Sequence, residues 1–163
     1  KFNVQAYYGD ATRPDLLHAA GIEHAKLLVI AIDDKDNTTE LAKYVLKHYP
    51  KVHIIARALD RPHVYDLWFA GCRDIIRETY DSSLRMARSS IEALGYSREQ
   101  ADEIVGAFDE MDRNSMIAGA EHFDPSIALE DNEAYVSAVL DRMKSWESEL
   151  GARLKEILSR PAA

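Results

Sequence analysis

Apolar residues gather into four short runs in the first half of the chain, each bounded by turn-forming or polar residues. The run Leu27–Ile32 is apolar without alternation, which is typical of a parallel strand covered on both faces. Val4–Tyr8, Val52–Ala58 and the short pair Ile75–Ile76 have a similar character. We expect these four runs to be strands of one sheet.

Helical signals separate these runs at short intervals. Thr12 and the polar run Asp36–Thr38 are N-cap candidates, and Pro14 suits a first helical turn because its missing N–H would have no partner there. Gly21 suits the left-handed residue that follows a helix end, and a third helix begins at Arg61–Pro62. Regular strand–helix alternation predicts an α/β class fold, a Rossmann-like parallel sheet of about four strands.

From about residue 81 the apolar spacing is helical throughout, which predicts a helical C-terminal extension. We therefore expect two parts: residues 1–80, the C-terminal portion of a Rossmann-like domain, and residues 81–163, a dimerisation or regulatory extension. The longest helix, about Asn132–Leu158, has apolar residues three and four apart, which would suit a coiled-coil seam. We favour docking of this helix on its own domain or on a dimer partner over a long free coil.

Charge and composition argue against some classes of function for this chain, nucleic-acid binding among them. The net charge is −8, and all of it comes from residues 81–163, since basic and acidic residues balance before residue 81. An acidic chain without a basic stripe is a poor nucleic-acid binder. No apolar run approaches the roughly 18 residues that a membrane span needs. The single cysteine, Cys72, is consistent with a reducing compartment, and we expect it to be a small core residue.

Polar residues follow successive predicted strands, at the sheet edge where ligands bind in open parallel sheets. These clusters are Gly9–Thr12, Ala31–Asp34, Arg57 with Asp60, and Arg77–Thr79. Glycine allows close approach to the backbone, and the next helix offers free N–H groups to an anion. Carboxylates suit ribose hydroxyls and arginine suits phosphate. The recurrence of these groups predicts a ligand site at this edge.

Simpler explanations exist for several of these residues. Asp33 or Asp34 could cap the following helix, and Arg57 could pair with Asp60. Trp68 and Phe69 are expected in the core rather than stacked on a ligand. No pair of the six histidines is spaced for zinc on one helix face, and no nucleophile arrangement is visible, so we expect neither a metal site nor catalytic residues.

The phosphate-binding motif Gly-x-Gly-x-x-Gly is missing, because none of the seven glycines has the required spacing. Two explanations remain open on the residues alone. Either the site is not a dinucleotide site, or its first strand–helix–strand unit lies upstream of Lys1.

Several motifs together resemble a known family. The stretch Tyr8–Leu17, with Ala20–Gly21 after it, is similar to the middle of a KTN (also RCK or TrkA-N) nucleotide-binding domain, and Ala31–Asp34 and Ile54–Ala58 match that family's next two strand ends. Arg77–Tyr80, leading into a helix that ends at Leu94-Gly95, resembles the glutathione-gated potassium-efflux antiporters of the Kef type. The likeness covers about residues 1–112.

The resemblance implies a domain that binds AMP or NAD(H), beside a dimer-interface pocket for glutathione or its adducts. The positions it implies for the nucleotide are Gly9, Asp10, Thr12, Ala31, Asp33, Asp34 and Arg57. The positions it implies for glutathione are Phe2, Asp60 and Arg77, with Asp112 or Asn114 in place of the asparagine that the family often carries. The family's glycine-rich loop and ribose-binding acid have no counterpart in this sequence.

The resemblance also implies a role and partners. The chain would be a cytosolic regulatory module, not an enzyme, on the cytoplasmic face of the inner membrane. Its partners would be the transmembrane antiporter domain of the same polypeptide, a second copy of itself, and an ancillary flavin oxidoreductase. The alternative is the second half of an NAD(P)-dependent oxidoreductase, which would need a proton donor at the strand ends. Without the first strands and glycine loop, the 163 residues are expected to bind nucleotide at least tenfold more weakly than a full domain.

Overall fold

The structure, a computed structural model, describes residues 5–160, so Phe2 lies outside the described residues. The contacts within the chain divide it into two units that meet between Glu78 and Thr79. No helix formed by residues 5–160 has the length and apolar character that a membrane crossing requires.

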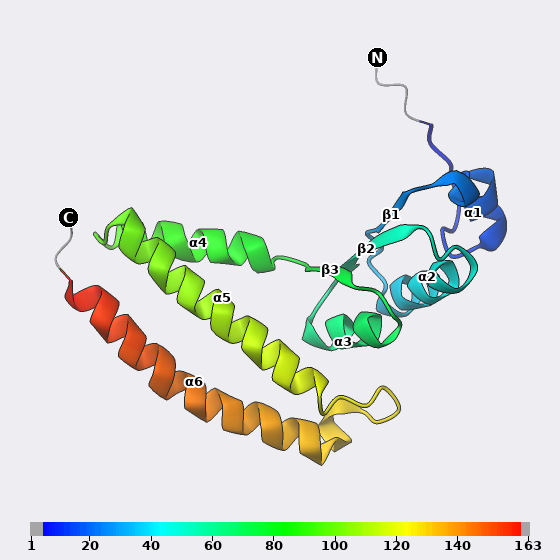
Figure 1. Cartoon of the computed structure of the whole chain (residues 1–163). Helices are drawn as coiled ribbons and strands as arrows, with labels where there is room; N and C mark the ends of the chain where they lie inside the picture. The colour runs from blue at the N-terminus through cyan, green and yellow to red at the C-terminus, as the bar shows by residue number, and fades with distance from the viewer. Residues whose placement is uncertain (1–4, 161–163) are drawn as a thin grey trace. The chain divides into compact units, whose positions relative to one another are not determined.

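The first unit is built on a parallel sheet of three strands in the order β1-β2-β3 (Figure 1). The strands are β1 (Leu27–Ile30), β2 (His53–Ala58) and β3 (Asp74–Arg77). Ile30 lies opposite Ala56, and Ala58 lies opposite Arg77, so the carboxyl ends of all three strands share one edge. This confirms the predicted parallel α/β arrangement and three of its four strands.

The prediction of a strand at Val4–Tyr8 is wrong for its described part. Residues 5–8 form no strand, and Val4 lies outside the described residues. A strand requires a neighbour to pair its backbone groups, and β1 pairs only with β2 among the described strands. Tyr8 is accordingly 95% exposed.

Three helices and a short 3-10 turn complete the first unit: α1 (Pro14–Ala19), η1 (Ile22–His24), α2 (Lys35–His48) and α3 (Arg61–Phe69). Both α2 and α3 contact β2, and the core between them contains Val45, Ile54, Ala56 and Leu67. Cys72 is buried in the same core, as predicted, but Trp68 and Phe69 are about half exposed, so their assignment to the core is wrong. They follow Leu67 on α3 and fall on its outer side.

The helix starts differ from the predicted caps. Among the candidates for the cap of α2, Asp34 fills the role through a hydrogen bond from the N–H of Asn37 to its carboxylate (2.8 Å), whereas Asp36–Thr38 lie inside the helix. Arg13, not Thr12, precedes α1. Gly21 has φ +84° directly after the end of α1, as predicted.

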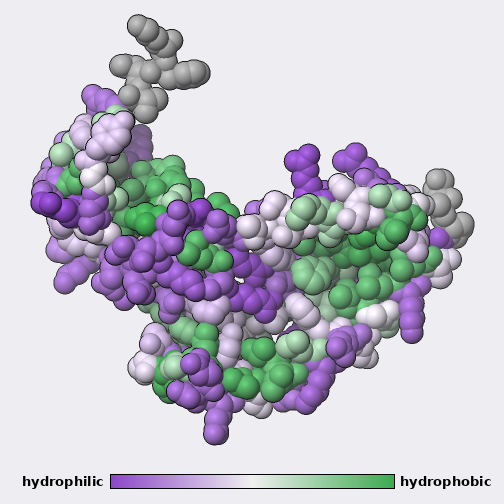
Figure 2. Space-filling view, turned by 180° about the vertical axis from the view of Figure 1, so that it is seen from behind, coloured by the Kyte–Doolittle hydropathy of each residue, from purple (hydrophilic) through white to green (hydrophobic). Residues whose placement is uncertain are grey.

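The second unit is helical: α4 (Tyr80–Ala93), α5 (Arg98–Ala120), η2 (Leu129–Asp131) and α6 (Glu133–Ser159). Helix α5 contacts both α4 and α6, so α6 is docked in cis rather than free (Figure 1). Hydrophobic side chains remain exposed on the surface of the second unit, among them Met86 and Leu94 on α4 and Met143 on α6. Figure 2 shows green, hydrophobic areas exposed on the face of the molecule that it draws.

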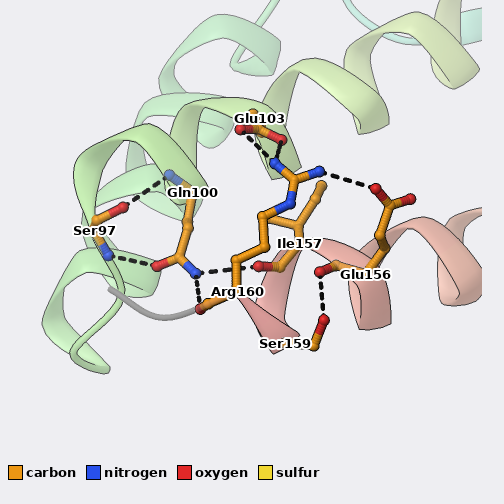
Figure 3. Close-up of polar contacts among 7 residues, drawn as sticks. All are labelled: Ser97, Gln100, Glu103, Glu156, Ile157, Ser159 and Arg160. Atoms are coloured by element: carbon orange, nitrogen blue, oxygen red, sulfur yellow. Dashed lines mark hydrogen bonds and ion pairs between the residues drawn. The ribbon is translucent and has the colours of Figure 1, made fainter. Parts of the chain in front are cut away.

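A polar clasp fastens the end of α6 to the start of α5 (Figure 3). The buried amide of Gln100 accepts the N–H of Ser97 at 3.0 Å and donates to the carbonyls of Ile157 and Arg160, both at 3.1 Å. The Arg160 guanidinium reaches both carboxylate oxygens of Glu103 at 3.0 and 3.1 Å. A capping box thus also serves as a contact between two helices.

Candidate ligand-binding site

Arg57 joins the carboxyl ends of the three strands. It is the next-to-last residue of β2, and its Nη2 donates to the Asp33 carboxylate and to the Ala31 carbonyl (3.2 Å) beyond β1. Its Nη1 donates to Glu78 (3.2 Å), just beyond β3. The Arg57 side chain is 26% exposed, whereas that of Asp33 is 95% exposed. The prediction that Arg57 and Asp33 share one sheet edge is confirmed in geometry.

The N-terminus of α2 lies directly after Asp33. Asp34 caps this helix, and the buried Thr38 hydroxyl donates to the Asp34 carbonyl at 2.7 Å. Of the two aspartates that could have been a cap, Asp34 fills that role and Asp33 does not. Asp33 therefore keeps a carboxylate on the surface at the strand ends.

Asp60 lies beyond β2 and links the starts of α2 and α3. Its carboxylate caps α3 by accepting the N–H of His63 at 3.0 Å, and it pairs with the ammonium of Lys35. Burial raises the pKa of Asp60, but the bonds from Lys35 and from the His63 N–H outweigh it and hold that pKa below its ordinary value. The possible pair between Arg57 and Asp60 does not form.

The loop before α1 carries Gly9, Asp10 and Thr12. The Asp10 carboxylate accepts the backbone N–H of Thr12 at 2.9 Å and its hydroxyl at 2.7 Å, and these bonds lower its pKa. The hydrogen bonds described for Asp10 are therefore all with residues of its own loop. Gly9 and Asp10 do not follow a strand, so the expectation that they stand at a strand end is wrong for the described residues.

The remaining predicted residues lie on both units. Arg77 is the last residue of β3, at the same sheet edge as Arg57. Asp112 and Asn114 lie on α5 in the second unit, where Asp112 is buried and Asn114 is exposed.

This sheet edge can bind a polar, partly anionic ligand. Two helices, α2 and α3, begin there and present backbone N–H groups, which favour anions. Asp33 offers an exposed acceptor for hydroxyl groups, and Arg57 offers a cation already shared between two carboxylates. An incoming phosphate would have to exchange with one of those carboxylates.

Sequence reasoning missed Lys35 and His63 at this edge, and it placed Glu78 in the Arg77–Thr79 cluster without proposing it as a partner of Arg57. Lys35 and Glu78 are the ion-pair partners of Asp60 and Arg57, and His63 is fully buried behind the Asp60 loop. Lys35 and Asp60 are 25 residues apart, so only the sheet brings them together. The cap signal at His63 was visible, because it stands three residues after an aspartate, the position that Glu or Gln fills in a capping box.

Comparison with family models divides the chain in two. Residues 1–78 match the TrkA-N domain, and residues 82–157 match the potassium efflux system KefB C-terminal domain.

Known relatives extend this result. The glutathione-regulated potassium-efflux system protein KefC of Salmonella arizonae is 44% identical over 108 residues, and that of Cronobacter sakazakii is equally similar. In both cases the match covers 66% of this chain and 17% of the relative, so the chain spans about a sixth of these proteins. A solved structure of the Kef CTD of Shewanella denitrificans, in AMP-bound form, is 38% identical with a TM-score of 0.72, covering 76% of this chain and 78% of that one.

The sheet, its strand-end site and the matched residues define a Rossmann-like domain of the TrkA-N, or RCK, class followed by a helical extension. Within that class the chain belongs to the KTN/RCK domains of Kef-type potassium-efflux antiporters.

Proposed function

We propose that this chain is the regulatory, ligand-binding part of a potassium-efflux antiporter, and that it gates transport in response to a nucleotide and to glutathione or its adducts. The observation that carries the proposal is its likeness to the Kef CTD that was solved with AMP. The group of Asp33, Arg57 and Glu78 at the strand ends supports it, because such groups suit a ribose and a phosphate.

For the nucleotide we propose AMP, with NAD(H) as the other ligand that the family class implies. The exposed Asp33 carboxylate accepts the ribose hydroxyls, and Arg57, still held by Glu78, turns toward phosphate. The N-terminus of α2 adds backbone donors for the same anion. The other positions proposed for this ligand are Gly9, Asp10, Thr12, Ala31 and Asp34.

For glutathione we propose Asp60 and Arg77 on the first unit, with Asp112 or Asn114 on the second; Phe2, also proposed, lies outside the described residues. Arg77 matches a glutathione carboxylate and Asp60 matches its amino group. Binding would favour one of two arrangements of a dimer and so bias the transporter, since a ligand shifts an equilibrium only through its different affinity for the two states.

The proposed organisation follows the predicted one, with a nucleotide-binding part over residues 1–80 and a helical extension over 81–163. The partners are the transmembrane domain of the same polypeptide, a second copy and an ancillary flavin oxidoreductase, at the cytoplasmic face of the inner membrane. The role is regulatory rather than enzymatic, because the groups gathered at the strand ends are carboxylates and guanidiniums that bind polar ligands.

The test compares two arginines at opposite ends of β3 in the intact transporter. Arg77 ends the strand at the proposed site, whereas Arg73 precedes it, stacks on Trp68 at 4.1 Å and donates to the Trp68 carbonyl at 2.6 Å. Potassium efflux from vesicles is titrated with a glutathione adduct. We expect Arg77→Ala to weaken activation about 10–150-fold, through loss of a charge-assisted pair of about 1.5–3 kcal/mol.

Arg73→Ala is the matched control and should leave the activation curve in place. If Arg77→Ala also leaves the curve unshifted, or if both variants shift it equally, Arg77 does not hold the adduct. Thermal unfolding of both variants separates this effect from a loss of folded protein.

A further inference from the structure

His63 forms the second half of a reciprocal cap at the start of α3. Its side chain is fully buried, and its Nδ1 accepts the backbone N–H of Leu59 at 3.1 Å. Its own backbone N–H donates to the Asp60 carboxylate at 3.0 Å. This arrangement is similar to a capping box, except that the His63 side chain accepts the N–H of Leu59, the residue before the N-cap, instead of the N–H of the N-cap residue Asp60. The cap fixes Leu59 and Asp60, the two residues that connect β2 to α3.

The partner of Nδ1 fixes the protonation state of the ring. Because the Leu59 N–H is a donor, Nδ1 must be unprotonated, so the proton of the neutral imidazole is on Nε2. Nε2 is buried and has no hydrogen-bond partner among the described residues. A second proton would set an N–H against the Leu59 N–H and place a positive charge in the interior.

Three charged groups act on the ring. Burial lowers the pKa of His63 below its ordinary value of 6.5, and the charge of Lys35 on α2 lowers it further, while Asp66, Asp60 and the backbone of Lys35 raise it. The carboxylates do not offset burial, because the pKa of His63 is lowered overall. The ring is therefore neutral near pH 7.

We propose that His63 is a pH-sensitive positioning residue, whose neutral ring holds the Leu59–Asp60 connection in place and whose protonation releases it. The first part of this proposal, that protonation of His63 releases the Leu59–Asp60 connection, depends only on the hydrogen bonds of the cap. Its consequence, that ligand binding at Asp60 weakens in acid, rests on the proposed function. The site would thereby respond to acidification as well as to ligands.

The direction of the pH effect follows from the lowered pKa. The unfolded chain binds a proton at His63 more readily than the folded chain does. The stability that the neutral ring provides is thus complete above about pH 6.5 and is lost as the pH falls from there through the lower pKa of the folded state.

The experiment uses nitrogen-15 NMR on the whole 163-residue chain. At pH 7.5 the His63 ring should show a protonated Nε2 and an unprotonated Nδ1. As the pH falls to 5, the amide of Leu59 should shift with the same midpoint as the ring. Its hydrogen exchange, corrected for the intrinsic rate, should rise about tenfold as its acceptor is lost.

His63→Gln is the matched variant, because glutamine offers an amide oxygen acceptor at the same position but does not titrate. It identifies the His63 signals and should leave the Leu59 amide unchanged from pH 7.5 to 5. A proton on Nδ1 at pH 7.5 in the wild type would overturn the proposal without any variant. So would a Leu59 amide that titrates alike in both proteins.

Adenosine is the ligand probe, because the phosphate of AMP has a pKa near 6 that would confuse the profile. Its affinity should fall from pH 7.5 to 5 in the wild type and stay constant in His63→Gln. Parallel profiles would overturn the coupling to the site. If adenosine does not bind at pH 7.5, AMP at that pH decides whether the nucleotide function fails, while the NMR result still decides the role of His63.

Discussion

Gly95 ends α4 in a backbone conformation that other residues adopt only with strain. Its φ is +97°, and a Cβ added there would meet nothing within 4 Å, so the strain would be purely conformational. Gly106 lies within α5, also with open space for a Cβ and with ordinary helical geometry. We expect Gly95→Ala to destabilise the helical unit by about 1 kcal/mol and Gly106→Ala to stabilise it by about 0.5–1 kcal/mol.

Urea denaturation followed by Trp146 fluorescence measures both variants, since Trp146 lies on α6 of the same unit. Opposite signs are the expected result. If both substitutions stabilise the protein, Gly95 does not require its left-handed conformation.

Single side chains also show which contacts the sequence alone could not predict. The sequence offered Asp33, Asp34 and the run Asp36–Thr38 as caps of α2, and only the end of β1 selects Asp34. The partners of Arg57 lie 24 and 21 residues away, so no local pattern could identify them. The residue types at the strand ends were predictable, whereas their pairing was not.

At the scale of elements, we expect the stability of the helical unit to depend on the side-chain NH₂ group of Gln100. Gln100→Glu keeps the acceptor for the Ser97 N–H but replaces the NH₂ group that donates to the carbonyls of Ile157 and Arg160. A buried carboxylate oxygen would then face two carbonyl oxygens. We expect the helical unit to lose about 1–3 kcal/mol of stability.

Glu103→Gln is the control, because it makes the reverse exchange on the exposed side of the same helix. It weakens only the half-exposed pair with Arg160, worth about 0–1 kcal/mol. Urea denaturation compares the two variants. A loss at Glu103 as large as that at Gln100 would show that the ion pair, not the amide, fastens α6.

Strong periodicity made most elements predictable. The apolar runs gave β1, β2 and β3 to within about two residues, and the helical spacing gave α6 to within one residue at each end. The run Val4–Tyr8 looked equally strand-like, but a strand depends on a neighbour that its own residues do not encode. Helix α3 kept its predicted start, while the exposure of Trp68 and Phe69 depends on which side meets the sheet.

For the whole molecule, the change in charge balance and periodicity near residue 80 coincides with the point where the contacts separate, between Glu78 and Thr79. What the sequence could not supply is the assembly of the site, because residues of β1, β2 and β3 meet only in the folded sheet. Each unit also contains one tryptophan, Trp68 or Trp146, which allows the two to be followed separately.

These tryptophans test whether the nucleotide site belongs to the first unit. Asp33, Arg57 and Glu78 all precede the boundary, so AMP should stabilise that unit directly. In Trp146→Phe, where Trp68 is the only reporter, AMP at 100 times its Kd should stabilise the chain by about 2.7 kcal/mol. In Trp68→Phe the unfolding transition reported by Trp146 should stay in place if the units unfold independently.

Asp33→Asn with Trp68 as reporter should reduce the stabilisation by AMP, because a neutral amide is a weaker acceptor for ribose hydroxyls. Equal shifts of both reporters would mean that the two units unfold together or that ligand contacts extend beyond the first unit, whereas an unshifted Trp68 transition would contradict a site in the first unit.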